Sequence, residues 1–276
     1  MGSDASAGTV GADSVSDTIV AHDLGYMYPQ PPTHALSGVS VAVQPGQFVA
    51  IMGPNGSGKT TFVKLMLGLL QPSEGEVLVQ GHAPGAGGAP MHHCIGYVPQ
   101  YRAINREVPV RVRDAVTMAA HCGCAGAGSG REVRRRVDRA LEMVELSDVA
   151  GRPFSALSGG QQQRALMARA LVVDPLILIA DEPFAGVDAV SHQRILELLH
   201  WLAHDKGVTV MAVVHDINPM VHFLDRVLLL NTRMIAYGEP AEVLTSSTLE
   251  ETYGRSVPIL VCDDGFLHPI TEAPHG

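Results

Sequence analysis

Alternating and continuous apolar runs mark the strands that this chain is expected to form. Val39, Val41 and Val43 occupy every second position before Gln44-Pro45-Gly46, a pattern that predicts a half-buried strand ending at a turn. The run 176–180 is apolar throughout, as in a strand buried on both faces of a parallel sheet. We expect further strands at 48–52, 77–79, 95–98 and 208–214.

Helical periodicity appears in three other segments. Positions 110–120 and 132–146 show it, and a Gly-rich break at 123–130 separates them. In the second segment the apolar residues fall at i, i+3, i+4 and i+7, which is the stripe of an amphipathic helix: Val137, Ala140, Leu141 and Val144. A similar stripe predicts a helix that covers the parallel sheet: Ile195, Leu198, Leu199 and Leu202. Arg134-Arg135-Arg136 is interpreted as a solvated helix face, with a partner contact as the alternative.

Composition predicts a packed globular chain. Of its 276 residues 46% are apolar and 17% charged, which excludes disorder for most of the chain. Residues 1–18 are rich in Gly, Ala, Ser and Asp; we expect a disordered tail, and no basic start or apolar stretch marks it as a secretory signal. The net charge of −9 disfavours a nucleic-acid partner. No apolar run reaches eighteen residues, so the chain is not expected to cross a bilayer itself.

Cysteine and histidine spacing does not predict a metal finger or a disulfide framework. The four cysteines are Cys94, Cys122, Cys124 and Cys262. Those near His92, His93 and His121 could suggest a metal site, but the paired spacing of structural zinc ligands is missing. We therefore expect reduced cysteines.

A phosphate-binding loop is predicted between the strand-like run 48–52 and a helix-like run that begins at Thr61. Eight residues fill the G-x-x-x-x-G-K-[ST] pattern: Gly53, Pro54, Asn55, Gly56, Ser57, Gly58, Lys59 and Thr60. The glycines let backbone N–H groups point at an anion, and the helix adds its positive end. Lys59 would reach the β- and γ-phosphates and Thr60 would ligate Mg²⁺, with Thr61 among the nucleotide-binding residues. A chance glycine-rich turn is the alternative.

Two acidic residues end the buried run 176–180, at the edge of the sheet where ligands bind. Asp181 is placed to hold Mg²⁺ through water, and Glu182 to polarise the attacking water. Adjacent buried carboxylates would be costly without a cation. An acidic turn after a strand is the plainer alternative.

The segment Leu157-Ser158-Gly159-Gly160-Gln161 resembles the signature of the ATP-binding cassette (ABC) ATPases. It reads as an exposed helix start whose N–H groups can meet an anion. The order of elements supports the resemblance, because the family's other motifs occur at its usual intervals: the loop at 53–60, Val98-Pro99-Gln100, the signature, Asp181-Glu182, Asp188 and His215.

The resemblance, which covers 19–238, implies roles for three of these residues. Gln100 matches the glutamine that touches Mg²⁺ or water, and His215 matches the histidine that contacts the γ-phosphate; a structural histidine is the alternative. Asp188 lies in the loop through which two subunits communicate, although Gly186-Val187 replaces the family's usual Ala-Leu. With Lys59 and Glu182, His215 would make up the catalytic set.

An aromatic ring ahead of the first hairpin is expected to stack on adenine. Tyr28 is our prediction and Tyr26 the alternative. A role in packing is the alternative for both rings.

In the family two cassettes pair head to tail, so the resemblance implies that Ser158 and Gly160 complete the γ-phosphate site of a second copy. ATP and Mg²⁺ are the implied cofactors. The expected fold is α/β: a P-loop NTPase of the ABC type, with a mainly parallel core sheet, an antiparallel β subdomain and an inserted helical subdomain. The expected divisions are a tail at 1–18, the ABC domain at 19–238 with its helical part at about 101–165, and a C-terminal extension at 239–276.

Finer resemblance concerns the cargo. The stretches at 96–100, 181–188, 215–218 and 225–231 look like the cassettes of bacterial zinc and manganese importers. That similarity implies a peripheral subunit on the cytoplasmic face of the membrane, bound to permease subunits and served by an extracytoplasmic metal-binding protein. The alternatives are another cargo, such as an iron chelate or cobalamin, or a soluble ABC ATPase outside transport.

Overall fold

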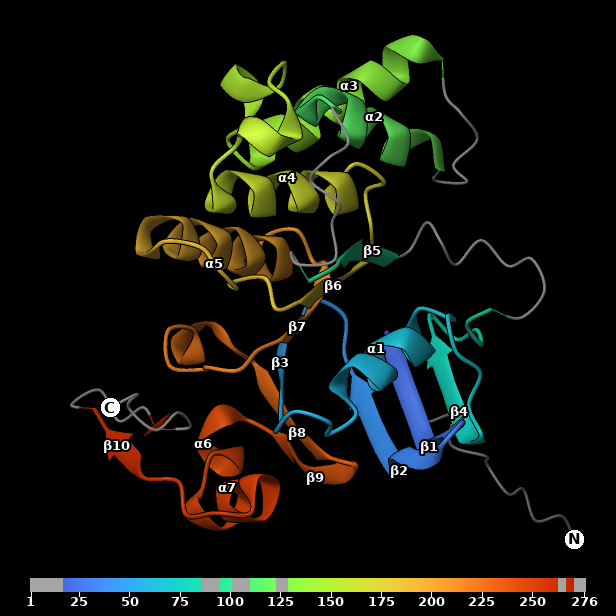
Figure 1. Ribbon diagram of the computed structural model, residues 1–276, viewed down its shortest axis with the longest axis vertical. Helices are drawn as coiled ribbons and strands as arrows, with labels where there is room; N and C mark the ends of the chain where they lie inside the picture. Colours follow the sequence, from blue (N-terminus) through green and yellow to red (C-terminus); the bar gives the residue numbers. More distant parts are fainter. Residues whose placement is uncertain (1–16, 86–94, 101–109, 123–128, 263–266, 271–276) are drawn as a thin grey trace, which may run out of the picture.

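The computed structural model describes residues 17–85, 95–100, 110–122, 129–262 and 267–270 (Figure 1). Its central element is a six-stranded sheet with the strand order β5-β6-β7-β3-β8-β9, parallel except for the antiparallel pair β8 and β9. The strands are β3 (Phe48–Met52), β5 (Ile95–Val98), β6 (Ile177–Asp181), β7 (Thr209–Val213), β8 (Arg226–Asn231) and β9 (Arg233–Gly238).

A second, antiparallel sheet has the order β2-β1-β4. Its strands are β1 (Ile19–Pro29), β2 (Pro32–Val43) and β4 (Glu74–Val79). Two further short strands, β10 (Ile259–Val261) and β11 (Leu267–Pro269), pair with each other near the C-terminal end.

The helices are α1 (Lys59–Met66), α2 (Val112–Cys122), α3 (Gly130–Met143), α4 (Gly159–Leu171), α5 (Ala189–His204), α6 (Pro240–Val243) and α7 (Ser246–Tyr253). Short 3-10 turns lie at Ser147–Val149, Phe154–Ala156 and Val221–Phe223. In Figure 1, α2 to α5 gather at one end of the molecule, whereas α1 and the antiparallel sheet lie together on the other side of the main sheet. None of the helices in the described parts of the chain is long and apolar enough to span a membrane.

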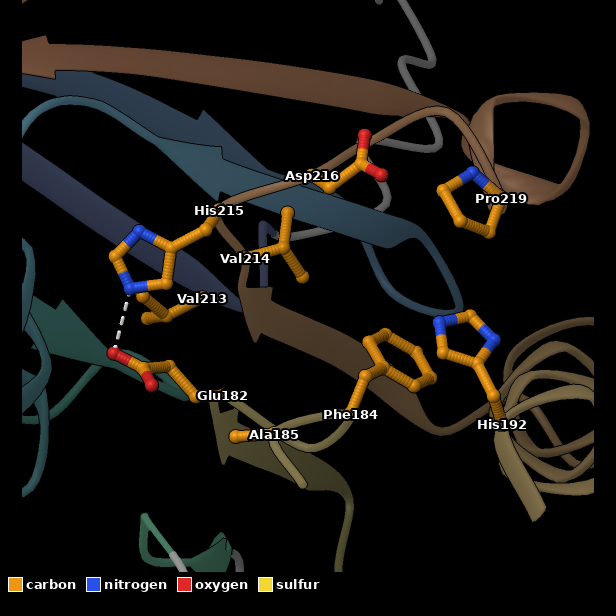
Figure 2. A pocket seen from close by; sticks show the side chains of 9 residues that line it. All are labelled: Glu182, Phe184, Ala185, His192, Val213, Val214, His215, Asp216 and Pro219. Carbon is orange, nitrogen blue, oxygen red and sulfur yellow. Dashed lines mark hydrogen bonds and ion pairs between the residues drawn. The ribbon is translucent and has the colours of Figure 1, made fainter. Parts of the chain in front are cut away.

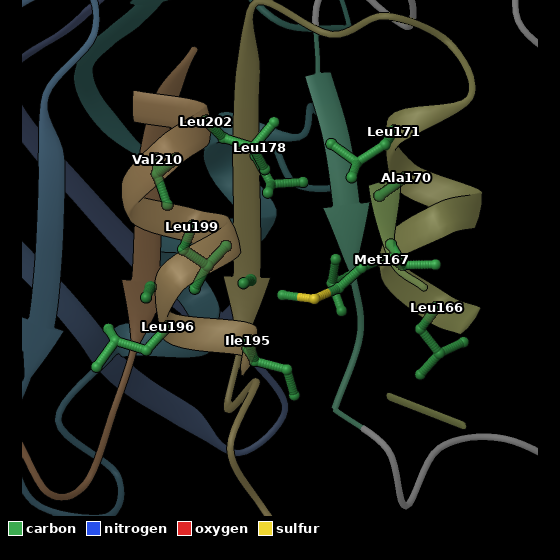
Figure 3. Close-up of a cluster of buried hydrophobic side chains, with 14 of the residues drawn as sticks. Leu166, Met167, Ala170, Leu171, Leu178, Ile195, Leu196, Leu199, Leu202 and Val210 are labelled. Atoms are coloured by element: carbon green, nitrogen blue, oxygen red, sulfur yellow. The ribbon is translucent and has the colours of Figure 1, made fainter. Parts of the chain in front are cut away.

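The main sheet separates two apolar cores, and β3 contributes to both. Phe48, Ala50 and Met52 pack with α4 and α5 in the larger core, part of which Figure 3 shows. Val49 and Ile51 face the other way, toward α1 and the antiparallel sheet. Because side chains alternate along a strand, a strand buried on both faces must be apolar at every position. This arrangement explains the continuous apolar runs in the sequence.

The expected architecture of a mainly parallel core sheet, an antiparallel sheet and added helices is confirmed. Most expected strands agree with the structure to within one residue. The helix expected at 132–146 instead ends at Met143, because Glu145 takes a left-handed conformation with φ of 55°. The one expected from Thr61 begins at Lys59 and ends at Met66.

The expected divisions at residues 18 and 238 stay predictions. Thr18 nevertheless donates its N–H to Val43 O, so backbone pairing begins there. Residues beyond 238 also enter the larger core, among them Val243, Leu244 and Leu249.

Candidate active site

The loop between β3 and α1 surrounds the amino group of Lys59. This side chain is only 7% exposed, and its Nζ donates to Gly53 O at 2.7 Å and to Pro54 O at 2.9 Å. Burial lowers the pKa of Lys59, while the charges of Glu182 and Asp181 oppose that shift. The loop therefore holds a partly desolvated cation that faces two carboxylates.

Two glycines of this loop lie where no side chain fits. A Cβ on Gly58, whose φ is +98°, would lie 2.4 Å from Ala35 O, and one on Gly53 would lie 2.0 Å from Leu230 O. The close approach brings the loop against β2 and β8. These positions require glycine because only a hydrogen atom can be accommodated there.

The carboxylates follow from the end of β6. Asp181 is its last residue and is buried, whereas Glu182 turns away with φ of 51° and donates its N–H to Val213 O. Burial and the nearby Glu182 raise the pKa of Asp181, and Lys59 and His215 oppose the rise. Two consecutive residues thus have different surroundings: Asp181 is shielded from solvent, whereas Glu182 is partly exposed.

Glu182 is held between two other elements. His215 Nε2, after β7, lies 2.8 Å from Glu182 Oε1 (Figure 2), and Gln100 Nε2, after β5, donates to Glu182 Oε2 at 2.5 Å. The carboxyl ends of three parallel strands bring these three side chains together, as the topology of such sheets dictates.

A cavity of about 270 Å³ lies beside the loop. Tyr28 lines it and its hydroxyl lies 3.2 Å from Thr61 Oγ1. Tyr26 meets Tyr28 edge to face but packs against the smaller core, so Tyr28 is the ring that reaches the cavity. The remaining lining residues are Thr33, His34, Ala35, Asn55, Gly56, Ser57, Gly58, Lys59, Thr60, Glu182, Val213 and His215.

Sequence reasoning missed Thr33, His34 and Ala35. They lie near the start of β2, where Thr33 pairs with Tyr28 across the first hairpin. The position of Gly58 against Ala35 O explains why this strand forms one wall of the cavity.

The expected signature begins a helix, as predicted. Ser158 is the N-cap of α4, where its Oγ accepts from Gln161 N and its own N–H donates to Gln161 Oε1, forming a capping box. Gly159 and Gly160 occupy the first turn. Among the described residues that line the cavity beside the loop, none belongs to this signature.

The sequence profile of the ABC transporter family matches residues 36–185, more than half of the chain. The chain belongs to the ABC transporter family. With the fold described above, this confirms the expected P-loop NTPase of the ABC type.

Similar cassettes come from several bacteria. The zinc transport system ATP-binding protein TroB of Treponema pallidum (strain Nichols) is 39% identical over 85% of this chain and 86% of its own length. The manganese transport system ATP-binding protein MntB of Bacillus subtilis (strain 168) is 37% identical, over 82% and 88%. The zinc import ATP-binding protein ZnuC of Brucella abortus (strain 2308) is 36% identical, over 86% and 73%.

Solved structures of similar cassettes share the fold. A dimeric ATP-binding cassette in a post-hydrolysis state, bound to ADP and Pi, has a TM-score of 0.71 and 32% identity, covering 80% of this chain and 98% of that one. A metal-chelate type ABC transporter in an inward-facing conformation has a TM-score of 0.78 and 25% identity, covering 94% and 99%. The chain is accordingly an ABC ATPase that binds ATP.

The donors of this cassette suit Mg²⁺. Thr60 is an exposed residue of the cavity and carries a hydroxyl, and Asp181 and the amide of Gln100 add oxygen atoms, the ligands that Mg²⁺ prefers. Because the pKa of Asp181 is raised even beside Lys59, its negative charge is incompletely compensated within the chain. A divalent cation would supply that compensation.

Asp188 has a local role in the single chain. It is the N-cap of α5, where Oδ1 accepts from Ser191 N at 2.9 Å and Oδ2 from Ser191 Oγ at 2.8 Å. These bonds lower the pKa of Asp188. Its contact with a second subunit stays a prediction.

The histidines and cysteines set aside in the sequence form no metal site within the described ranges. Cys262 is exposed with a free thiol, and His121 Nδ1 lies 2.8 Å from Thr117 O. His92, His93, Cys94 and Cys124 lie outside the described residues, as does the side chain of Cys122.

Proposed function

We propose that this ABC ATPase energises the import of a divalent metal ion, zinc or manganese, through a separate membrane permease. One observation carries the proposal: relatives named for zinc or manganese transport match 82–86% of this chain at 36–39% identity. A match of this length extends well beyond the nucleotide-binding motifs.

Hydrolysis would use three side chains of this cavity, Lys59, Glu182 and His215. Lys59 would bind the β- and γ-phosphates, and Glu182 would accept a proton from the attacking water. Each oxygen of Glu182 already accepts one contact, from His215 or Gln100, and keeps a second lone pair for water. Bound Mg²⁺, held by Thr60, Gln100 and Asp181, would neutralise phosphate charge.

A second copy would complete the site. Since the signature lies outside the cavity of its own chain, Ser158 and Gly160 are proposed to contact the nucleotide of a partner cassette. The dimeric arrangement of the ADP-bound cassette supports this pairing. Closure would then depend on ATP and opening would follow hydrolysis.

The proposed place of work is the cytoplasmic face of the membrane. The cassette would bind permease subunits, and an extracytoplasmic metal-binding protein would deliver the ion to them.

Metal uptake tests the cargo. Cells that lack this chain should lose accumulation of radioactive zinc or manganese under starvation, and the wild-type gene should restore it while Glu182→Gln should not. Unchanged uptake of both ions in the deletion strain would reject zinc and manganese as the cargo. It would not affect the assignment of the chain as an ABC ATPase.

A second cargo class is a metal chelate, favoured by the metal-chelate type transporter that matches 94% of this chain. The same cells would then lose uptake of an iron chelate or cobalamin and retain free zinc and manganese. Purification from detergent-solubilised membranes separates both from a soluble ABC ATPase, because only a transport subunit should bring a multispanning membrane protein with it.

A further inference from the structure

Three helices of the cassette meet at the side chain of Glu145, which none of the motifs above includes. Glu145 follows the C-cap of α3, its neighbour Arg164 lies on α4, and Arg194 lies on α5. The separations along the chain are 19 residues to Arg164 and 49 residues to Arg194. The cluster therefore connects parts of the chain that have no local reason to meet.

Arg164 closes the end of α3. Its side chain is 9% exposed, and Nη1 donates to Val144 O at 2.9 Å and to Glu145 O at 3.4 Å. A cation at the C-terminal carbonyls of a helix satisfies acceptors that have no partner within the helix and favours the negative end of its dipole. This contact attaches α4, the helix that begins at the signature, to α3.

The carboxylate of Glu145 then joins two arginines. Its Oε2 accepts from Arg194 Nη1 at 3.0 Å and from Arg164 Nη1 at 3.4 Å. Burial lowers the pKa of Arg164, the positive charge of Arg194 lowers it further, and Glu145 and Asp188 oppose both effects. Without the carboxylate of Glu145, Asp188 alone would offset the repulsion between the two guanidinium groups at the junction of α4 and α5.

The arginines sit about one turn and a half from functional ends of their helices. Arg164 follows the N-cap Ser158 by six residues, and Arg194 follows the N-cap Asp188 by six residues. At those ends the helices already touch, since a Cβ on Gly160 would lie 2.1 Å from Ser191 Oγ. The cluster at Glu145 and the contact of Gly160 with Ser191 therefore join the same two helices, α4 and α5.

We propose that Glu145 is a positioning residue for ATP hydrolysis, which fixes the signature helix α4 against α5 by accepting hydrogen bonds from Arg164 and Arg194. Glu145 does not line the cavity beside the phosphate-binding loop, and it would act through the orientation of Ser158 and Gly160. The inference rests on the proposed head-to-tail pairing, in which those two residues serve the second copy.

The backbone of Glu145 allows a clean substitution. Its φ of 55° is a conformation that glycine adopts without strain. Glu145→Gly therefore removes the carboxylate without straining the backbone. Glu145→Gln keeps the shape and removes the charge. A matched control is Arg233→Gln, which breaks an ion pair of 2.8 Å to Glu251 between β9 and α7.

The experiment measures steady-state ATPase activity and single-site nucleotide binding with a fluorescent ATP analogue in the full chain. Both Glu145 variants should lose about three- to tenfold in kcat and show a lower Hill coefficient, while the dissociation constant of the single site stays within about twofold. Arg233→Gln should match the wild type. Unchanged kcat and Hill coefficient in both Glu145 variants, or an equal loss of nucleotide binding, would overturn the proposal.

A double variant separates positioning by charge from general loss of structure. Adding Arg194→Gln to Glu145→Gln removes one of the two repelling cations. The double variant should therefore have a higher kcat than Glu145→Gln alone. High salt should also reduce the defect of Glu145→Gln, because the repulsion is screened. A kcat of the double variant below that of either single variant would contradict the proposed role of Glu145 in positioning α4. A wild-type chain without cooperativity would instead refute the proposed head-to-tail pairing on which this inference rests.

Discussion

Asp181 and Glu182 are neighbours in the sequence with opposite surroundings. Asp181 ends a fully buried strand, whereas the Glu182 side chain is 21% exposed and lies between His215 and Gln100. The change of backbone conformation at Glu182 separates them, because its positive φ points the second carboxylate away from the strand. One position is thus suited to a cation and the other to a proton from water.

Glu182→Gln should bind ATP with nearly wild-type affinity and lose about 10²–10⁴-fold in kcat, since an amide keeps the shape and cannot take a proton. ATP should then hold the variant as a dimer, which size-exclusion chromatography would detect. Glu197→Gln, on the exposed face of α5, serves as the control. Wild-type turnover in Glu182→Gln would remove this residue from the chemistry.

Asp181→Asn should stabilise the nucleotide-free protein in a pH-dependent way. The folded pKa of Asp181 lies above the ordinary 3.8, so the ionised form is disfavoured in the native state and stability falls as the pH rises through that window. The asparagine variant lacks this loss. Its melting temperature should exceed that of the wild type by more at about pH 8 than at about pH 4.

Differential scanning fluorimetry across that range measures the effect, with Asp205→Asn, exposed at the end of α5, as the control. The stabilised variant should also hydrolyse no Mg-ATP. A gap in melting temperature that narrows as the pH rises would contradict the assigned direction of the pKa shift.

At the scale of elements, α4 rests on the start of α5 with no room for a methyl group. A Cβ on Gly160 would lie 2.1 Å from Ser191 Oγ and 2.4 Å from Ser191 Cβ. We expect Gly160→Ala to reduce ATPase activity at least about tenfold, because α4 must move away from α5, while nucleotide binding in the single chain persists. Measuring both quantities in the same preparation checks this expectation.

Two companions sharpen that test. Gly151→Ala introduces the same methyl group where nothing lies within 4 Å, so activity should not change. Ser191→Gly added to Gly160→Ala removes the colliding atoms and should restore part of the activity. If the second change restores nothing, the defect lies outside this contact.

The sequence predicts best those elements whose packing is repetitive. Strands β3, β6 and β7 are buried at every position and read as continuous apolar runs. Strand β1 could not be recognised, because irregular pairing between Ala21 and Met27 breaks its alternation. The end of α3 was missed since Glu145, a residue that rarely does so, adopts the left-handed turn usually marked by glycine.

In the site, the loop and the acidic pair follow from local patterns, whereas contacts across the fold do not. Nothing around Glu145 indicates Arg194, 49 residues away. Likewise, Ala35 comes against Gly58 only because β2 folds back beside the loop. Such contacts depend on tertiary packing that a single sequence does not encode locally.

At the scale of the whole molecule, residues beyond 238 are part of the packing. Val243, Leu244, Leu249 and Val257 are at most 3% exposed and belong to the larger core. A chain that ends at residue 238 should therefore lose several kcal/mol of stability, at about 1.5–3 kcal/mol for each buried side chain. Thermal melting and soluble yield measure this loss.

A chain that ends at residue 258 is the comparison. It keeps all four buried residues and removes only residues 259–276, which include β10 and β11. Its melting temperature should therefore stay much closer to that of the full chain. Equal melting temperatures for the two truncations would show that α6 and α7 contribute little.

The close approach of Gly53 to Leu230 O has a consequence for how the central sheet assembles. Because β3 is apolar on both faces, a shift of one residue along β8 would still bury only apolar side chains. The hydrophobic effect therefore does not disfavour the shifted register. A slip would, however, bring Met52 or Pro54 to the spot where a Cβ lies 2.0 Å from a carbonyl oxygen. The first glycine of the phosphate-binding loop therefore favours the observed register of β3 against β8, independently of any nucleotide.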